Sequence, residues 1–180
     1  MKITPWTKLK ETKVYNGYRS IIKRVFELPT GKSMEYDIVA GGNFASIAAI
    51  TKDAQVLLVR QFRPGPERIL MSTPSGYIDT NEAPEVAARR ELLEETGYQA
   101  EEVFFKKIVT LPYGTGSQYC FVATGCEKVQ EQRLDDTEFI EVVTMNLSDF
   151  KAKLRDAQDL DLYNLTASYL LLDHLGTFSK

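Results

Sequence analysis

Residues Gly76–Tyr98 read GYIDTNEAPEVAARRELLEETGY, and this stretch decides the fold. Its first part is rich in turn residues and predicts a loop. Its second part predicts a helix that begins near Pro84 and ends before Gly97. Proline suits the first helical turn because its missing N–H would have no partner there, and glycine suits the left-handed position just past a helix end.

Three carboxylates gather on one face of this predicted helix. At about 100° per residue, Glu91, Glu94 and Glu95 fall close together on the helical wheel. Arg90 lies one turn before Glu94 and can hold it as an i,i+4 ion pair. Small residues on the same side leave the carboxylates open, and apolar residues on the other sides can pack on a core (Ala87 and Ala88; Val86, Leu92 and Leu93).

The carboxylates repel one another. Each pair about 6 Å apart costs roughly 0.7–3 kcal/mol for effective dielectric constants between about 80 and 20, and Glu82 adds a fourth negative charge. A fold tolerates this where the face is solvated or where a cation occupies it. Oxygen-only ligands select hard ions, and Mg²⁺ is the usual ion where a phosphate shares the site. The local chemistry therefore leaves two interpretations, a solvated acidic face and a divalent metal site next to a phosphate.

The spacing of these residues resembles the Nudix box, G-x5-E-x7-R-E-U-x-E-E-x-G-U, in which U is a bulky apolar residue. Eight positions match, and Tyr98 stands where an aliphatic residue is usual (Gly76, Glu82, Arg90, Glu91, Leu92, Glu94, Glu95 and Gly97). The resemblance implies an α/β fold, the Nudix α/β/α sandwich with a mixed sheet.

Composition limits the other function classes. The chain has 180 residues, a net charge of −3 and 26% charged residues, which predicts one domain with at most a small appendage. With a pI of about 5.3, no basic patch for nucleic acid or a membrane surface is expected. No long apolar run or signal peptide is evident, so we expect a cytoplasmic protein. Cys120 and Cys126 suit no zinc site and are predicted to be buried free thiols.

The remaining chain predicts a sheet flanked by helices. Residues 1–42 form an N-terminal segment: Met1–Lys13 is polar and loosely held apart from Trp6, and Val14–Glu27 and Ser33–Val39 build a small antiparallel β-sheet around a turn at Leu28–Lys32. Residues 43–180 form the main domain. Its expected strands are Phe44–Thr51, Gln55–Phe62, Ile69–Met71, Val103–Val109, Tyr119–Thr124 and Phe139–Thr144, and its later helices are Leu147–Ala157, capped by Asn146 or Ser148, and Leu162–Leu175, capped by Asp161.

A second resemblance narrows the reaction. Leu28–Lys32, Val56–Pro64 and Pro74–Gly76 occur in an order similar to the ADP-ribose and nucleoside-diphosphate-sugar branch of Nudix hydrolases, and Pro112 resembles a proline that marks ADP-ribose hydrolases. Many of these have glutamates where this chain has Ser72 and Gln118. We therefore expect a broader nucleoside-diphosphate-sugar pyrophosphatase, with ADP-ribose and GDP-mannose as candidate substrates.

Candidate roles follow from the residues and the resemblance. Glu91 and Glu95 are the first choices for ligands of Mg²⁺, or of Mn²⁺ in its place, and Glu94 follows for a metal or catalytic role. The resemblance implies the backbone carbonyl of Ser75 as a further ligand, and Glu82 is expected at the outer edge of the metal site. The general base is sought on a mobile acidic loop, Glu127–Glu138, with Asp136 and Glu138 as candidates. Substrate binding is assigned to Arg63, Gly76 and Arg90.

Two rival functions remain open. One is an RNA-end or nucleoside-triphosphate pyrophosphohydrolase of the same superfamily, and the other is a non-catalytic Nudix domain that senses a nucleotide sugar. The N-terminal sheet is too small to hide its apolar surface, so it must pack on the main domain or on another subunit. The resemblance implies exchange of this sheet between two subunits, and we expect a homodimer in which both subunits build the nucleotide pocket.

Overall fold

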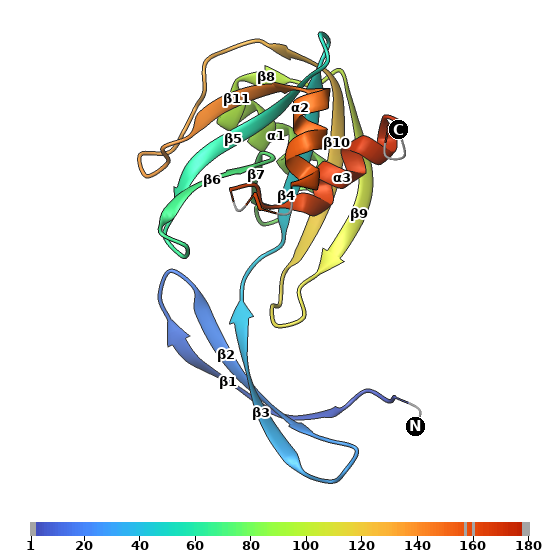
Figure 1. Cartoon of the computed structure of the whole chain (residues 1–180). Coiled ribbons are helices and arrows are strands. Elements are labelled where there is room, and N and C mark those ends of the chain that lie inside the picture. The colour runs from blue at the N-terminus through green and yellow to red at the C-terminus, as the bar shows by residue number, and fades with distance from the viewer. Residues whose placement is uncertain (1–2, 157, 160, 178–180) are drawn as a thin grey trace. The chain divides into compact units, whose positions relative to one another are not determined.

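The computed structural model describes residues 3–156, 158–159 and 161–177, and it contains an α/β fold (Figure 1). The chain forms two compact units. The first runs to Asn43 and includes Thr110–Ser117, and the second is built from Phe44–Val109 and the residues from Gln118 onwards.

The first unit is a three-stranded antiparallel sheet in the order β1-β2-β3. Its strands are β1 (Thr7–Asn16), β2 (Ser20–Glu27) and β3 (Ser33–Ala40). The predicted turn between β2 and β3 is present, because the N–H of Gly31 donates to the carbonyl of Leu28 over 2.9 Å. The expectation of a small antiparallel sheet is therefore confirmed.

The prediction of a loosely held segment at Met1–Lys13 is wrong from Thr7 onwards. Strand β1 is exposed along its whole length, so its sequence lacks the apolar alternation that marks a half-buried strand. Pairing with β2 holds it, from Thr7 opposite Glu27 to Asn16 opposite Ser20. An ion pair of 2.7 Å between Arg24 and Glu11 lies across the two strands.

The second unit contains a mixed sheet whose main path runs β11-β5-β4-β10-β8. Strands β4 and β10 pair in parallel, whereas β8 with β10, β11 with β5, β5 with β4, β7 with β4 and β6 with β5 pair antiparallel. The strands are β4 (Phe44–Thr51), β5 (Gln55–Arg63), β6 (Arg68–Ser72), β7 (Ser75–Tyr77), β8 (Tyr98–Gln99), β9 (Glu102–Thr110), β10 (Ser117–Lys128) and β11 (Glu141–Asn146).

Alternate residues of the central strands face two different cores. On one side, Ile47, Ala49 and Leu57 pack with Ala88 and Leu92 of helix α1 (Pro84–Thr96). On the other side the strand residues pack with helices α2 (Leu147–Arg155) and α3 (Leu165–His174), in a cluster that includes Ala48, Leu58, Val122, Phe150, Leu154 and Leu171. Figure 1 shows α2 and α3 in front of the sheet and α1 behind it. The predicted α/β/α sandwich is confirmed, because successive side chains of a strand point to opposite faces.

Several predicted element bounds are wrong in the second unit. The expected loop before α1 contains strand β7, and strand β10 continues to Lys128, so the acidic loop begins after Lys128 rather than at Glu127. Strand β11 begins at Glu141 rather than at Phe139. Val86 is 55% exposed and does not belong to the core.

The two later helices are shorter than predicted. Asn146 caps α2 as expected, accepting a hydrogen bond of 2.9 Å from the N–H of Asp149; the predicted helix end at Ala157 lies outside the described residues. Helix α3 begins at Leu165, and Asn164 rather than Asp161 stands at its N-cap. Its φ of 59° is in the left-handed region, which asparagine tolerates better than most residues.

Two further observations concern the cysteines and the length and polarity of the helices. Cys120 and Cys126 are free and buried, as predicted. In the described ranges no helix is both long enough and apolar enough to cross a membrane.

Candidate active site

The guanidinium of Arg90 binds three carboxylates of the site. Its Nε and Nη2 donate to the two oxygens of Glu82 over 2.9 and 3.0 Å, and its Nη1 donates to Glu91 over 2.7 Å and to Glu94 over 3.1 Å. Nη2 also donates to the carbonyl of Tyr77 over 2.9 Å. The predicted pair with Glu94 is present. These partners raise the pKa of Arg90, and Arg90 lowers the pKa of Glu82.

Glu95 is the most deeply buried carboxylate of the site, with 5% of its surface exposed. The backbone N–H of Ser75, in strand β7, donates to its Oε2 over 2.9 Å. Burial raises the pKa of Glu95 to about 8; the charges of Glu91 and Glu138 add to the rise, and the Ser75 hydrogen bond opposes it. The surroundings of Glu95 therefore disfavour its charged form.

Gly76 allows the loop to approach the helix closely. A Cβ atom at this position would lie 2.1 Å from the carboxyl carbon of Glu91, so any side chain would displace that carboxylate. Burial raises the pKa of Glu91, and the Arg90 contact opposes the rise. Glycine is thus needed here for space rather than for an unusual backbone angle.

The acidic loop after β10 is fastened to the C-terminal end of α1. Gly97 stands at the C-cap with φ 77°, and its carbonyl accepts from the N–H of Val129 over 2.9 Å. The N–H of Arg133 donates to the carbonyl of Glu94 over 2.9 Å, and the amide of Gln132 donates to the carbonyl of Glu95 over 2.6 Å. These contacts satisfy carbonyls that a helix end leaves without intrahelical partners.

Further along this loop, the two candidate bases are placed differently. Glu138 closes a turn, in which its Oε2 accepts from the N–H of Asp135 over 3.1 Å. Its negative charge raises the pKa of both Glu91 and Glu95. Asp136, two residues earlier, is exposed, as is Glu138.

Arg63, at the end of β5, approaches the site from another direction. Its positive charge lowers the pKa of Glu95. Its Nη2 donates to the hydroxyl of Tyr163, and its guanidinium carbon lies 5.2 Å from the centre of that ring. Its Nε is buried without a hydrogen-bond partner. Sequence reasoning missed Tyr163, because no local pattern marks a contact between residues 100 positions apart.

The carboxylates of the site bear on whether it could hold a metal ion. Among the described residues, no group of three or more histidine, cysteine, aspartate or glutamate side chains is arranged to hold an ion. Arg90 engages oxygens of Glu82, Glu91 and Glu94, which accounts for this arrangement. The chemistry nevertheless fits a hard divalent cation, because the half-buried Glu91 disfavours the charged form of the buried Glu95 and a cation would offset both charges.

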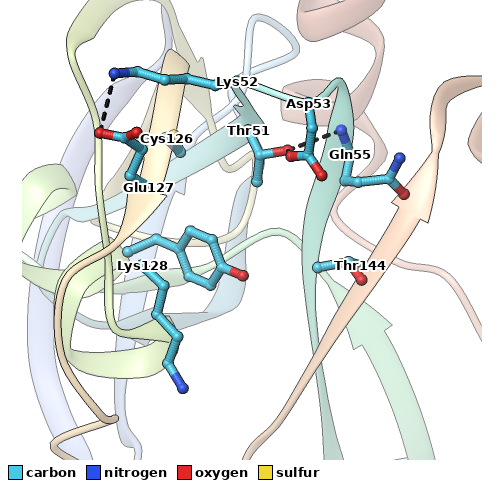
Figure 2. Close-up of a pocket in the computed structure, with 9 residues that line it drawn as sticks. Thr51, Lys52, Asp53, Gln55, Cys126, Glu127, Lys128 and Thr144 are labelled. Atoms are coloured by element: carbon cyan, nitrogen blue, oxygen red, sulfur yellow. Dashed lines mark hydrogen bonds and ion pairs between the residues drawn. The ribbon is translucent and has the colours of Figure 1, made fainter.

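Two hollows lie elsewhere in the second unit. One of about 550 Å³ lies at the β4–β5 turn, where Lys52 and Glu127 form an ion pair of 3.0 Å (Figure 2). A second of about 540 Å³ shares Tyr98, Lys128 and Thr144 with the first. None of the predicted site residues lines either hollow. The carboxylate cluster is therefore a separate surface.

Known proteins resemble this chain in both sequence and fold. The family model described as NUDIX domain matches residues 43–166. ADP-ribose pyrophosphatase of Bacillus subtilis (strain 168) is 32% identical over 150 residues, which cover 81% of this chain and 78% of that protein. GDP-mannose pyrophosphatase of Cronobacter sakazakii is 33% identical over 147 residues, covering 74% and 73%. A crystal structure of an ADP compounds hydrolase has a TM-score of 0.80 at 22% identity and covers 98% of this chain and 99% of that chain, which supports the fold.

The burial of Glu95 predicts a pH-dependent change in stability. Its pKa is about 8 in the folded chain and near 4.5 in the unfolded chain. The stability that this group contributes is therefore greatest below pH 4.5 and is lost as the pH rises from 4.5 through 8, because over this range the unfolded chain releases a proton that the folded chain retains. Glu95→Gln removes this loss while its amide oxygen still accepts from Ser75. In chelator-treated protein at pH 9, the variant should unfold about 4–8 °C above the wild type, equivalent to roughly 2 kcal/mol.

The comparison is made by thermal unfolding from pH 5 to pH 9. The advantage of Glu95→Gln should be small at pH 5 and grow with pH. Glu85→Gln, on an exposed position of the same helix, is the control and should follow the wild type throughout. A constant difference between Glu95→Gln and the wild type across this range contradicts the burial argument.

Proposed function

The chain belongs to the Nudix family, and from this premise we propose that it hydrolyses the pyrophosphate bond of nucleoside diphosphate sugars to a nucleoside monophosphate and a sugar phosphate. One observation carries the proposal. Glu91, Glu94 and Glu95 lie on one helix, Arg90 binds Glu91 and Glu94, the charge of Glu138 raises the pKa of Glu91 and Glu95, and the positive charge of Arg63 lowers the pKa of Glu95. Buried carboxylates beside an arginine suit a substrate that brings cations and phosphates together.

We propose Mg²⁺ as the metal, with Mn²⁺ able to replace it. Glu91, Glu95 and the carbonyl of Ser75 would hold it, Glu94 would stand close by and Glu82 at the outer edge. When bound, a divalent ion neutralises diphosphate charge and lowers the pKa of a water ligand. Hydrogen bonds from Arg90 keep Glu82 and Glu94 in place. The absence of a side chain at Gly76 leaves the space that the Glu91 carboxylate occupies.

Arg63 is proposed to bind the substrate phosphates. Its guanidinium is a planar donor that matches phosphate oxygens. It lies close enough to Glu95 to lower the pKa of that carboxyl, so phosphates bound to Arg63 would lie next to the metal ligands. Arg90 has little free capacity for a phosphate while three carboxylates and a carbonyl accept from it, so we assign it to the organisation of the box.

Glu138 is proposed as the general base in preference to Asp136. A base must lie within reach of the water that attacks. The charge of Glu138 raises the pKa of Glu91 and Glu95, and the exposed side chain of Glu138, like that of Asp136, is accessible to water. The fastening of the preceding segment to the end of α1 supports this role, because it fixes where the loop begins.

Substrate preference is proposed to be broad. Ser72 and Gln118, which replace glutamates common in ADP-ribose hydrolases, are both buried, and Gln118 donates to Ser46 over 2.8 Å. Relatives named for ADP-ribose and for GDP-mannose are similarly close to this chain. We therefore expect ADP-ribose and GDP-mannose both to be cleaved, in the cytoplasm and without a nucleic-acid or membrane partner.

The function is tested with a panel of ADP-ribose, GDP-mannose, ATP and 5′-triphosphorylated RNA in the presence of Mg²⁺, with products separated by chromatography. AMP and GMP should appear with the corresponding sugar phosphates, and a chelator should abolish the reaction. Glu95→Gln should reduce the rate by several orders of magnitude, while Glu85→Gln keeps it. Cleavage of ATP or RNA ends alone supports the rival pyrophosphohydrolase. Binding of a nucleotide sugar without cleavage supports the sensing domain.

The assignment of Glu138 predicts a specific kinetic change. Glu138→Gln should lower kcat by about 10²–10⁴-fold with KM nearly unchanged, because the lost group acts on water in the transition state. Asp136→Asn should change kcat less than about twofold. If Asp136→Asn alone slows turnover, the roles are reversed, and if neither does, the base belongs to the box helix.

We further propose that the chain is a homodimer through its N-terminal sheet, and that each sheet contributes to the partner's nucleotide pocket. The first unit exposes large apolar side chains, among them Tyr18 at 96%, Tyr15 and Leu9. Surfaces of this kind mark interfaces, and two-fold dimers are the commonest way to cover them.

Light scattering on the full-length chain at micromolar concentration should give the mass of a dimer. Removal of residues 1–42 should give a monomeric or poorly soluble protein with much weaker nucleotide binding, although the whole Nudix box remains. A full-length monomer contradicts the shared pocket.

A further inference from the structure

A segment near the C-terminus is joined to the strand that leads into the site. The N–H of Met71 in β6 donates to the carbonyl of Asp161 over 2.7 Å, and the N–H of Tyr163 donates to the carbonyl of Met71 over 3.0 Å. These bonds form a parallel bridge between Met71 and Leu162. Strand β6 ends at Ser72, shortly before Ser75. The segment at 161–164 therefore lies beside the part of the chain that leads into the box.

Asn164 fixes this segment from the other side. Its left-handed backbone (φ 59°) turns the chain into α3. Its Nδ2 donates to the hydroxyl of Thr73 over 3.1 Å, and its Oδ1 accepts from the amide of Gln118. Thr73 and Gln118 are both buried, so these contacts are shielded from water. Tyr163 therefore stands between two fastened neighbours.

Tyr163 in turn holds Arg63. Within the described residues, the Tyr163 hydroxyl is the hydrogen-bond acceptor for the Arg63 side chain, and the ring lies 5.2 Å from the guanidinium carbon. The Nε of Arg63 is buried without a hydrogen-bond partner, so it supplies no further contact that could orient the guanidinium. An arginine side chain has several rotatable bonds, so its direction depends on few fixed contacts.

We propose that Tyr163 is a positioning residue, which holds the Arg63 guanidinium so that its free donors face the diphosphate of the substrate. The inference rests on the proposed function, since it assigns a diphosphate to Arg63. The hydroxyl supplies direction through a hydrogen bond, and the ring supplies attraction to the cation. Because the Arg63 guanidinium is already held in place, less side-chain conformational entropy is lost when the substrate binds.

The proposal is tested by a double-mutant cycle on ADP binding, measured by titration calorimetry. ADP carries the diphosphate without a sugar, and its binding requires no turnover. Tyr163→Phe removes the hydroxyl and keeps the ring, and it should weaken ADP binding about 3–10-fold. In an Arg63→Ala background the same substitution should have no effect, because the group that Tyr163 positions is gone. Tyr163→Ala should weaken binding more than Tyr163→Phe.

Tyr169→Phe is the matched control. The Tyr169 hydroxyl donates to the carbonyl of Leu154 over 3.0 Å, so its loss removes a tertiary hydrogen bond in the same helical layer. It should leave ADP affinity unchanged, with an unfolding temperature near that of Tyr163→Phe.

Three results overturn the proposal. They are an equal loss of affinity in the wild-type and Arg63→Ala backgrounds, no loss for Tyr163→Phe, and no binding of ADP by the wild type. Hydrolysis of the substrate panel is scored separately with the same variants. A chain that binds ADP with the expected coupling but cleaves no nucleotide sugar refutes the proposed function and leaves the role of Tyr163 standing. A chain that cleaves them without the coupling refutes the role of Tyr163 alone.

Discussion

One guanidinium organises the site. Arg90 is placed on α1 so that its donors reach Glu82 on the preceding loop, Glu91 and Glu94 on its own helix, and the carbonyl of Tyr77 in β7. A loop, a strand and a helix are thereby held by a single planar group, which lysine with its point charge could not replace. One positive charge among several carboxylates still leaves the cluster negative. Burial, together with this excess of carboxylates, raises the pKa of Glu91 and Glu95, the two glutamates whose charged forms burial disfavours most.

The two ends of α1 contribute differently to the chemistry. At the N-terminal end the box loop is fixed by Arg90 and Glu82. At the C-terminal end the carbonyls of Glu94 and Glu95 accept from the acidic loop, and Gly97 allows the chain to turn away. A Cβ at Gly97 would lie 2.2 Å from the carbonyl oxygen of Gln130, so the glycine also makes room for this loop. The requirement to satisfy helix-end carbonyls thus brings the loop of Glu138 to the residues that the box supplies.

The sequence predicted the elements whose signals are local. Helix α1 has Pro84 at its start, Gly97 at its end and a carboxylate spacing that leaves few alternatives, and strands β4 and β5 are rich in buried apolar residues. Strand β1 was missed because an exposed edge strand held by backbone pairing shows no apolar alternation. The start of α3 was placed too early because Asp161 is a common N-cap residue, whereas the left-handed backbone of Asn164 is set by its tertiary contacts.

The residues of the candidate site also differ in whether a local sequence pattern predicts them. Glu91, Glu94 and Glu95 could be placed together from helical geometry, and so could the ion pair with Arg90. The turn that Glu138 closes with Asp135 could not be predicted, because no local pattern in the acidic loop marks it. Tyr163 could not be found either. Its contact with Arg63 joins the end of β5 to the entrance of α3, and only the folded sheet brings these points together.

The bridge between Met71 and Leu162 also has a consequence for synthesis on the ribosome. A nascent chain emerges from its N-terminus, so β4, β5, β6 and α1 are available to fold well before residues 161–164. Until then, one side of β6 lacks its last backbone partners and Arg63 has no tyrosine to bind. The carboxylates of α1 are thus available early in the growing polypeptide, whereas the tyrosine that supports Arg63 is synthesised 100 residues after it.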